Sequence, residues 1–180
     1  EPGGLEFLKN VEQAYGSYLF GSKLQIDAGK FVTPAGAEVI ETKDNWNYTR
    51  SWLGELSPYY QTGVRAAYSF GPRWSGQLHL LNGWQVIGEN NGSKAVGTQV
   101  AYSADRFSAS FNTFVGPELA GNDDDYRVLG DVVATFRPSR SLSLGASFDL
   151  SREGRPVGDP AHWMGVGAYA RYAPPESKTA

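Results

Sequence analysis

The chain lacks several features that would assign it to common protein classes. It contains no cysteine, so disulfide bonds and thiolate metal ligands make no contribution to its structure. It has no apolar run near the roughly 18 residues that a membrane-spanning helix requires, which excludes a helical membrane protein. The net charge of −3 is too small to indicate a nucleic-acid partner. No signal-peptide pattern follows Glu1, so we expect a mature or cropped segment of a longer protein.

What the chain has is an alternation of apolar and polar residues with a period of two. Val64 and Phe70 belong to one face of such a segment, and Arg65 and Ser69 belong to the other. The segments are joined alternately by tight turns and by longer polar loops. Hairpins in series with one apolar face predict an antiparallel up-and-down transmembrane β-barrel, an all-β fold.

We expect about nine strands in one β-barrel domain that spans residues 1–180. Their ranges are 9–20, 22–32, 59–70, 74–84, 95–104, 106–116, 126–137, 140–151 and 161–173. Single-chain bacterial barrels have an even number of strands. The polar tail from Pro174 onward also differs from a terminal strand. We therefore expect a fragment or an incomplete part of a larger barrel.

The aromatic residues gather near the ends of these segments, where a membrane barrel places rings at the lipid headgroups. The rings expected at this membrane interface, beside the short turns, are Tyr68, Phe70, Trp74, Tyr102, Phe107 and Phe136. Those expected to form an opposite girdle are Tyr60, Trp84, Tyr126 and Trp163. Rings near turns also occur in soluble sheets, so a soluble extracellular β-sandwich that binds ligand through its loops is one alternative.

The two faces of the predicted wall differ in what they contact. The side chains expected to face lipid are Leu80, Val100, Phe111, Val132 and Leu144. Those expected to line the pore are Arg65, His79, Arg127, Asp131 and Asp149. Charges on an inner face need water or one another, and a water-filled lumen provides both. The leading function is therefore passive diffusion of small hydrophilic solutes; the alternative is a structural barrel that sheathes or docks a partner protein.

One connection, residues 33–57, is too long for a hairpin and is expected to be functional. It carries Trp46, Tyr48, Arg50 and Trp52, whose rings are expected to pack inward as a constriction loop. This packing would bring Arg50 to face Asp131 or Asp149. The alternative is that the loop covers the barrel mouth.

No residue pattern indicates catalysis, and we predict neither an enzyme nor a cofactor. The chain has two histidines, His79 and His162, and no nucleophile motif accompanies either of them. The run Asp123–Asp125 lacks the spacing of a calcium loop, so no metal site is expected.

Several short motifs in order resemble the OmpL-like putative β-barrel porin family of Gram-negative outer membranes. They are Gly29–Glu38, Asn47–Ser51, Pro58–Arg65 and Asn82–Trp84, and the resemblance spans roughly residues 11–116. It implies a porin located in the bacterial outer membrane. The partners expected are the lipid bilayer, lipopolysaccharide and small hydrophilic solutes, but no nucleic acid. Association with a second copy or with a partner protein stays open.

Overall fold

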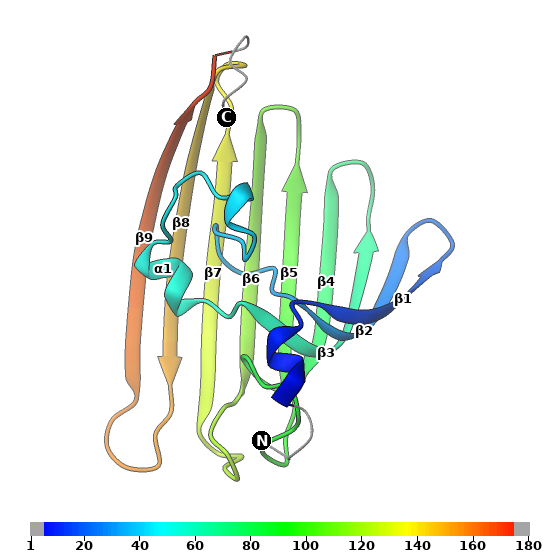
Figure 1. The fold of residues 1–180 in the computed structure, drawn as a ribbon, viewed down its shortest axis with the longest axis vertical. Helices are drawn as coiled ribbons and strands as arrows, with labels where there is room; N and C mark the ends of the chain where they lie inside the picture. Colours follow the sequence, from blue (N-terminus) through cyan, green and yellow to red (C-terminus); the bar gives the residue numbers. More distant parts are fainter. Residues whose placement is uncertain (1–5, 175–180) are drawn as a thin grey trace.

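The computed structural model describes residues 6–174, in which nine antiparallel strands form one sheet in chain order (Figure 1). The strands are β1 (Ala14–Phe20), β2 (Leu24–Val32), β3 (Tyr60–Ser69), β4 (Trp74–Leu81), β5 (Ala95–Ser103), β6 (Phe107–Pro117), β7 (Tyr126–Phe136), β8 (Leu142–Glu153) and β9 (Ala161–Tyr172). The helical elements are η1 (Glu6–Asn10), η2 (Thr42–Asp44) and α1 (Trp52–Leu56). The all-β, up-and-down antiparallel fold is confirmed.

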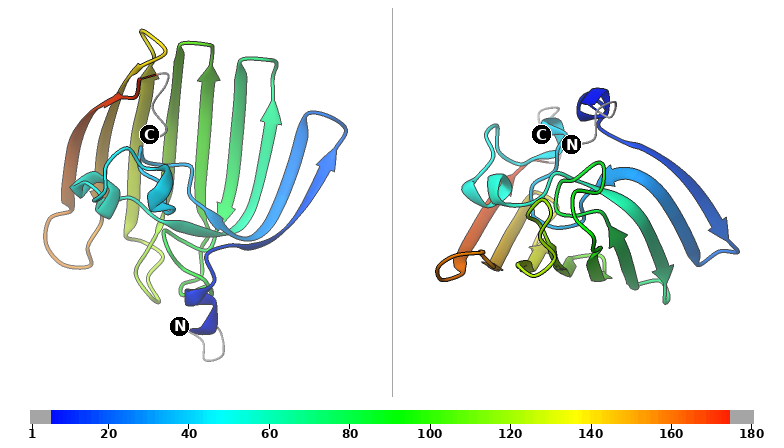
Figure 2. Two further views of the ribbon diagram at one scale, coloured as in Figure 1. Left: turned by 45° about the horizontal axis from the view of Figure 1, so that its top comes forward. Right: turned by 90° about the horizontal axis from the view of Figure 1, so that it is seen from below.

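The sheet curves into an arc without closing, as a partial barrel does (Figure 2). Each strand pairs with its chain neighbours, and β1 and β9 are the two edges of the described sheet. A β-sandwich needs two sheets packed face to face. All nine strands of residues 6–174 belong to one sheet, which contradicts the sandwich alternative.

The connections differ in length at the two ends of the sheet. The short turns lie at the upper end in Figure 1, and the longer loops after β2, β4, β6 and β8 lie at the lower end. The loop between β2 and β3, residues 33–59, does not stay at that end. It crosses the concave inner face of the sheet and carries α1 towards β9 (Figures 1 and 2).

The burial of side chains is the reverse of that in a soluble protein. Val132 and its neighbours on the convex outer face are exposed, whereas His79 and Asp131 on the inner face are each only 1% exposed. The five residues expected to face lipid, Leu80, Val100, Phe111, Val132 and Leu144, are all exposed. Because soluble proteins bury apolar residues and expose charged ones, this outer face is suited to an apolar surrounding.

The first predicted strand is wrong over its first residues. Residues 9 and 10 belong to η1, and β1 begins only at Ala14. The ammonium group of Lys30 donates hydrogen bonds to the carbonyl oxygens of Leu8 (2.9 Å) and Val11 (2.7 Å). The turn presents both carbonyls to one buried cation, which a paired strand could not do.

Two further sequence expectations concern the chain ends and helices. Residues 1–5 and 175–180 lie outside the described residues, so the expectation for most of the polar tail stays a prediction. Within residues 6–174, no helix combines the length and the apolar character needed to cross a membrane.

Candidate pore interior

Polar side chains form a continuous belt along the inner face from β1 to β8. The strand register places Asp27 opposite Arg65, Gln99 opposite Asn112, and Asp131 opposite both Asn112 and Asp149. The belt consists of Ser17, Asp27, Arg65, His79, Gln77, Gln99, Asn112, Asp131 and Asp149. Four of the five predicted pore-lining residues therefore lie in one belt.

At the β2–β3 part of the belt, the charges are paired. Arg65 donates from Nε (3.0 Å) and Nη2 (2.7 Å) to Oδ2 of the buried Asp27. Ser17 and Gln25 donate to the other carboxylate oxygen at 2.6 and 2.8 Å. The guanidinium also lies 4.5 Å from the ring centre of Phe31. Asp27 is thus a compensated charge, which is what burial requires.

In the middle of the belt, side-chain amides form a chain of hydrogen bonds that all donate in the direction from β4 to β7. His79 lies between the side-chain oxygens of Gln61 (3.1 Å) and Gln77 (3.0 Å). Gln77 then donates to Gln99 at 2.8 Å, and Gln99 donates to Asn112 at 2.8 Å. Asn112 donates to Oδ1 of Asp131 at 2.5 Å, where the chain ends. Both ring nitrogens of His79 are therefore occupied by glutamine side chains.

The β7–β8 end of the belt holds two carboxylates that have no basic partner in the described part of the chain. Asp131 and Asp149 are 1% and 2% exposed, respectively. Oδ2 of Asp131 and Oδ1 of Asp149 are buried and have no hydrogen-bond partner among the described residues. The other Asp131 oxygen accepts from the backbone N–H of Gly36, in the loop, at 3.1 Å. The loop and the wall therefore meet at this carboxylate pair.

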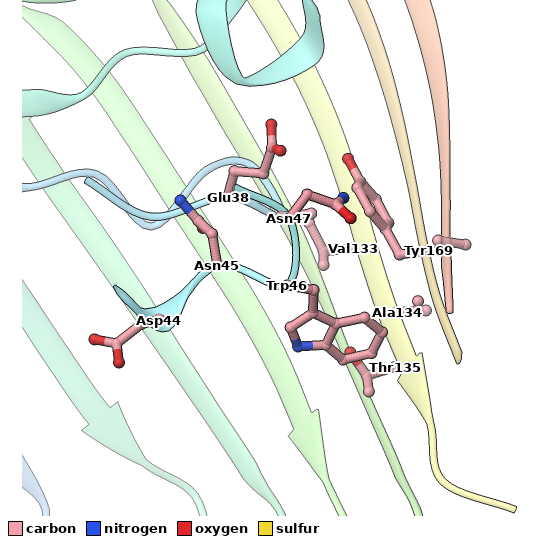
Figure 3. A pocket seen from close by; sticks show the side chains of 12 residues that line it. Glu38, Asp44, Asn45, Trp46, Asn47, Val133, Ala134, Thr135 and Tyr169 are labelled. Carbon is pink, nitrogen blue, oxygen red and sulfur yellow. The ribbon is translucent and has the colours of Figure 1, made fainter. Parts of the chain in front are cut away.

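Small residues on the inner face of β8 and β9 create the space into which the loop packs. The ring of Trp46 lies over Gly145, where an added Cβ would come within 3.4 Å of it. The side chain of Leu53 occupies the space above Gly165, so a Cβ there would collide with it. Figure 3 shows Trp46 beside Thr135 in the cavity of about 100 Å³ that separates the loop from β7–β9.

The loop is held in shape by its own side chains. Glu38 accepts hydrogen bonds from the backbone N–H (2.9 Å) and the hydroxyl (2.7 Å) of Ser51, the N-cap residue of α1. Asn45 exchanges two hydrogen bonds with the backbone of Val39, at 2.8 and 2.9 Å. These bonds within the loop fix its shape in addition to its contacts with the wall.

The structure corrects three of the expectations for this loop. Arg50 does not face Asp131 or Asp149, because it donates to the carbonyls of Val39 (3.3 Å) and Ile40 (2.5 Å). Tyr48 and Trp52 do not pack inward, since they are 99% and 85% exposed. Of the aromatic rings named for the constriction, only Trp46 lies against the wall. That the loop constricts a water path stays a prediction.

The fifth predicted pore residue, Arg127, belongs to a cluster at the long-loop end. Its guanidinium lies 4.9 Å from the ring centre of Trp84 and 5.8 Å from that of Trp163. Its Nη2 donates to Glu153 at 2.7 Å, and its Nη1 lies 4.0 Å from the carboxylate of Glu118. Burial raises the pKa of Glu118 to about 7, although Arg127 and the N–H of Trp84 act in the opposite direction.

The expected second girdle of rings is therefore wrong for Trp84 and Trp163. Trp84 is buried against Phe114, with ring centres 5.1 Å apart, and Trp163 contacts the inner-face Arg127. Tyr126 is exposed on the outer face. At the short-turn end, the six predicted interface rings lie beside the turns, and Trp74 pairs with Tyr102 at 4.9 Å. Their contact with lipid headgroups stays a prediction.

Sequence analysis missed an apolar cluster on the inner face near the long loops. It consists of Phe31, Ala35, Leu81, Trp84, Ala95, Phe114 and Leu129. Leu81, Phe114 and Leu129 occupy inner-face positions in strands whose other inner residues are mostly polar. These apolar residues at otherwise polar positions were the sequence feature that could have indicated the cluster. The cluster fills part of the interior and anchors the loop of residues 82–94 through Trp84.

The remaining candidates do not form a binding site within the described chain. Asp123 accepts a hydrogen bond from the N–H of Gly92 at 2.8 Å, which joins two loops. Residues 6–174 hold no group of three or more histidine, aspartate or glutamate side chains arranged to bind a metal ion. His162 is exposed beside the start of β9.

Comparison with known proteins agrees with the geometry of the sheet. A model of the family described as Putative beta-barrel porin-2, OmpL-like, matches residues 4–179, nearly the whole chain. No curated protein and no solved structure matches the chain.

Proposed function

Because this chain belongs to the OmpL-like beta-barrel porin-2 family, we propose that it acts as a porin of a Gram-negative outer membrane. Small hydrophilic solutes would diffuse passively through the interior of the barrel to which this sheet contributes. The family is a porin family and not an enzyme family. The transported solute class, the membrane and the passive mode of transport are all part of the proposal.

The observation that carries the proposal is the reversal of side-chain burial across the sheet. The outer face is covered by exposed apolar side chains, such as Leu80, Val132 and Leu150. Contact between these side chains and water is energetically unfavourable. The inner face carries the polar belt. A wall that is apolar outside and polar inside matches a bilayer around it and an aqueous lumen within it.

The ends of the sheet support a fixed position across the bilayer. Short turns with aromatic rings beside them are typical of the periplasmic rim of bacterial barrels, and long loops of the extracellular rim. Exposed Phe70 and Trp74 flank one such turn. The bilayer and, at the long-loop rim, lipopolysaccharide are then the surroundings of the protein.

Two features that occupy the interior of the sheet favour a narrow passage over a wide one. The loop of residues 33–59 lies over β7–β9, and Trp84 with its apolar neighbours fills the interior near β4–β7. Polar residues that remain along such a passage screen solutes by size and charge. A partner protein that seals the lumen, the structural alternative, would leave no ion path.

The test is ion conductance of the purified full-length protein in planar lipid bilayers. We expect discrete, ohmic conductance steps that a mock preparation without the protein does not give. Asp105→Asn, an exposed change in a short turn, serves as the matched control and should conduct like the unaltered protein. Protein that is inserted and folded but carries no current would overturn the porin proposal in favour of the structural barrel.

A further inference from the structure

The two buried carboxylates of the belt present an electrostatic problem that the rest of the belt does not have. Asp131 and Asp149 lie directly opposite each other on adjacent strands. Each has one buried oxygen without a hydrogen-bond partner among the described residues. Like charges in directly opposed positions repel, and burial in a medium of low dielectric constant strengthens that repulsion.

Within residues 6–174, none of the groups that contact the pair supplies a positive charge. From β6, Asn112 donates one hydrogen bond; β9 offers Gly165 in register with Asp149; and the loop contributes the N–H of Gly36. The hydroxyl of Ser57, also in the loop, lies beside Asp149. All four of these neighbours are neutral.

The nearby charged groups have other partners, and the hydroxyl of Tyr169 on β9, which lies beside Gly167, carries no positive charge. In the loop, Glu38 accepts from Ser51, and Arg50 donates to the loop's own carbonyls while lying 5.3 Å from the ring centre of Tyr59. Glu55 interacts with the Tyr59 hydroxyl. His79 is held by Gln61 and Gln77, and Gln99 and Asn112 separate it from Asp131. The counter-charge of the carboxylate pair must come from elsewhere.

A proton shared between the carboxylates satisfies both requirements at once. It removes one of the two like charges, and it provides an O–H donor for one of the two unpartnered oxygens. Side-by-side carboxyl groups that cannot both ionise commonly hold one proton in this way. The closed arrangement of loop and wall therefore retains a proton that separated, solvated carboxylates release.

We propose that Asp131 and Asp149 form a proton-dependent latch that holds the loop of residues 33–59 against β7–β9. The loop contacts the pair through Gly36, and its position is completed by Trp46 over Gly145 and Leu53 over Gly165. When the shared proton is lost, the pair draws in water and the loop leaves the wall. Because the closed state binds more protons, rising pH favours the open state.

The latch has a structural test that does not depend on conductance. The chain has no cysteine, so paired spin labels can be attached only at introduced positions. We would label Tyr48→Cys in the loop and Asp105→Cys in a short turn, since both residues are exposed. Distances between the labels would be measured at about pH 5 and about pH 9. We expect one narrow distribution at low pH and a broader or displaced one at high pH.

The variant Asp149→Asn tests whether the pH response comes from the Asp131–Asp149 pair. Its amide can donate to Asp131 as the protonated carboxyl does, so the label distances should stay narrow at both pH values. Glu118→Gln is the matched control, because Glu118 is a second buried carboxyl group that contacts Trp84 and Arg127 and not the loop of residues 33–59. This control should keep the pH-dependent change of the unaltered protein. Identical distributions at both pH values, or a pH response that persists in Asp149→Asn, would overturn the latch.

Conductance then connects the latch to the proposed function, on which only this part of the inference rests. The conductance step should rise with pH in the unaltered protein and in Glu118→Gln, and it should stay at its low-pH value in Asp149→Asn. A pH-dependent distance without any current refutes the porin proposal and leaves the latch intact. A current without a pH-dependent distance refutes the latch and leaves the porin intact.

Discussion

The side chain of Leu53 in α1 fills the space that a side chain at Gly165 of β9 would occupy. Residue 165 lies next to Asp149 in the strand register. The helix of the loop thus packs on the wall where a strand residue has no side chain, one strand away from the carboxylate pair. A glycine in a strand often marks such a close approach.

This packing predicts that Gly165→Val displaces the loop. Two methyl groups cannot share the site with Leu53, so the loop should leave the wall and the single-channel conductance should rise. Gly16→Val is the control, because a Cβ at Gly16 meets no atom within 4 Å. Equal conductance in the two variants would show that the loop does not limit the passage.

Removal of the loop provides a second, coarser test of the same passage. Deletion of residues 40–55 takes away Trp46 and Leu53, the two side chains that pack over glycines of the wall. We expect larger conductance steps in planar bilayers than the full chain gives. A deletion variant that folds but conducts as the full chain does would place the narrowest point elsewhere, with the apolar cluster around Trp84 as the next candidate.

A charged side chain on the outer face near the middle of the bilayer should destabilise the protein. Val132→Arg puts a guanidinium on the exposed apolar face and should cost about 2–4 kcal/mol if that residue lies near the bilayer midplane. Ser108→Arg, on the inner face near a short turn, is the matched control and should cost far less. Refolding titrations from detergent into lipid measure both values. Ser147, also on the inner face, does not suit as a control, because it is buried and its hydroxyl lies against Gly167 of β9.

The two rims should differ in their access from outside the cell. Proteases added to intact cells are expected to cut within residues 82–94, 118–125 and 154–160, the long loops, because these should face outward. The turns after Phe70, Ser103 and Phe136 should be cut only in opened cells. The reverse pattern would invert the proposed orientation.

Glu118 should make folding stability depend on pH near neutrality. Its pKa is raised from an ordinary 4.5 to about 7, so the folded chain keeps a proton that the unfolded chain has already lost. Stability should therefore fall as pH rises from 4.5 to about 7. Glu118→Gln should remove the contribution of Glu118 to this slope and be more stable than the unaltered protein by about 1–3 kcal/mol at about pH 8. Urea unfolding in detergent at several pH values measures the difference, with Asp105→Asn as the control.

The strands were predictable because their alternation is local information. The ranges expected for the β4 to β9 region lie within three residues of those observed at every end, and the five residues expected to face lipid are all exposed. The first strand failed because a distant cation, Lys30, binds the carbonyls of Leu8 and Val11. No property of residues 9–13 alone indicates that contact.

The interior was predictable in composition but not in its contacts. The alternation placed Asp131 and Asp149 on the inner face, yet only the register brings them opposite each other. The loop's inward course was expected from its rings, but Gly145 and Gly165 determine which side chains it inserts. Arg50 was expected to face the wall because the neighbouring rings were expected to pack inward, whereas the carbonyls of its own loop bind it.

The amide chain from Gln77 to Asp131 has a consequence for how the strands behave together. Each amide donates to the next one, and the last donates to Oδ1 of Asp131, so this acceptor oxygen sets the orientation of three side chains on three strands. One amide cannot turn over alone without placing donor against donor. The row therefore behaves as a single polarised unit. The orientation of the Gln77 amide on β4 depends on the acceptor oxygen of Asp131 on β7, three strands away.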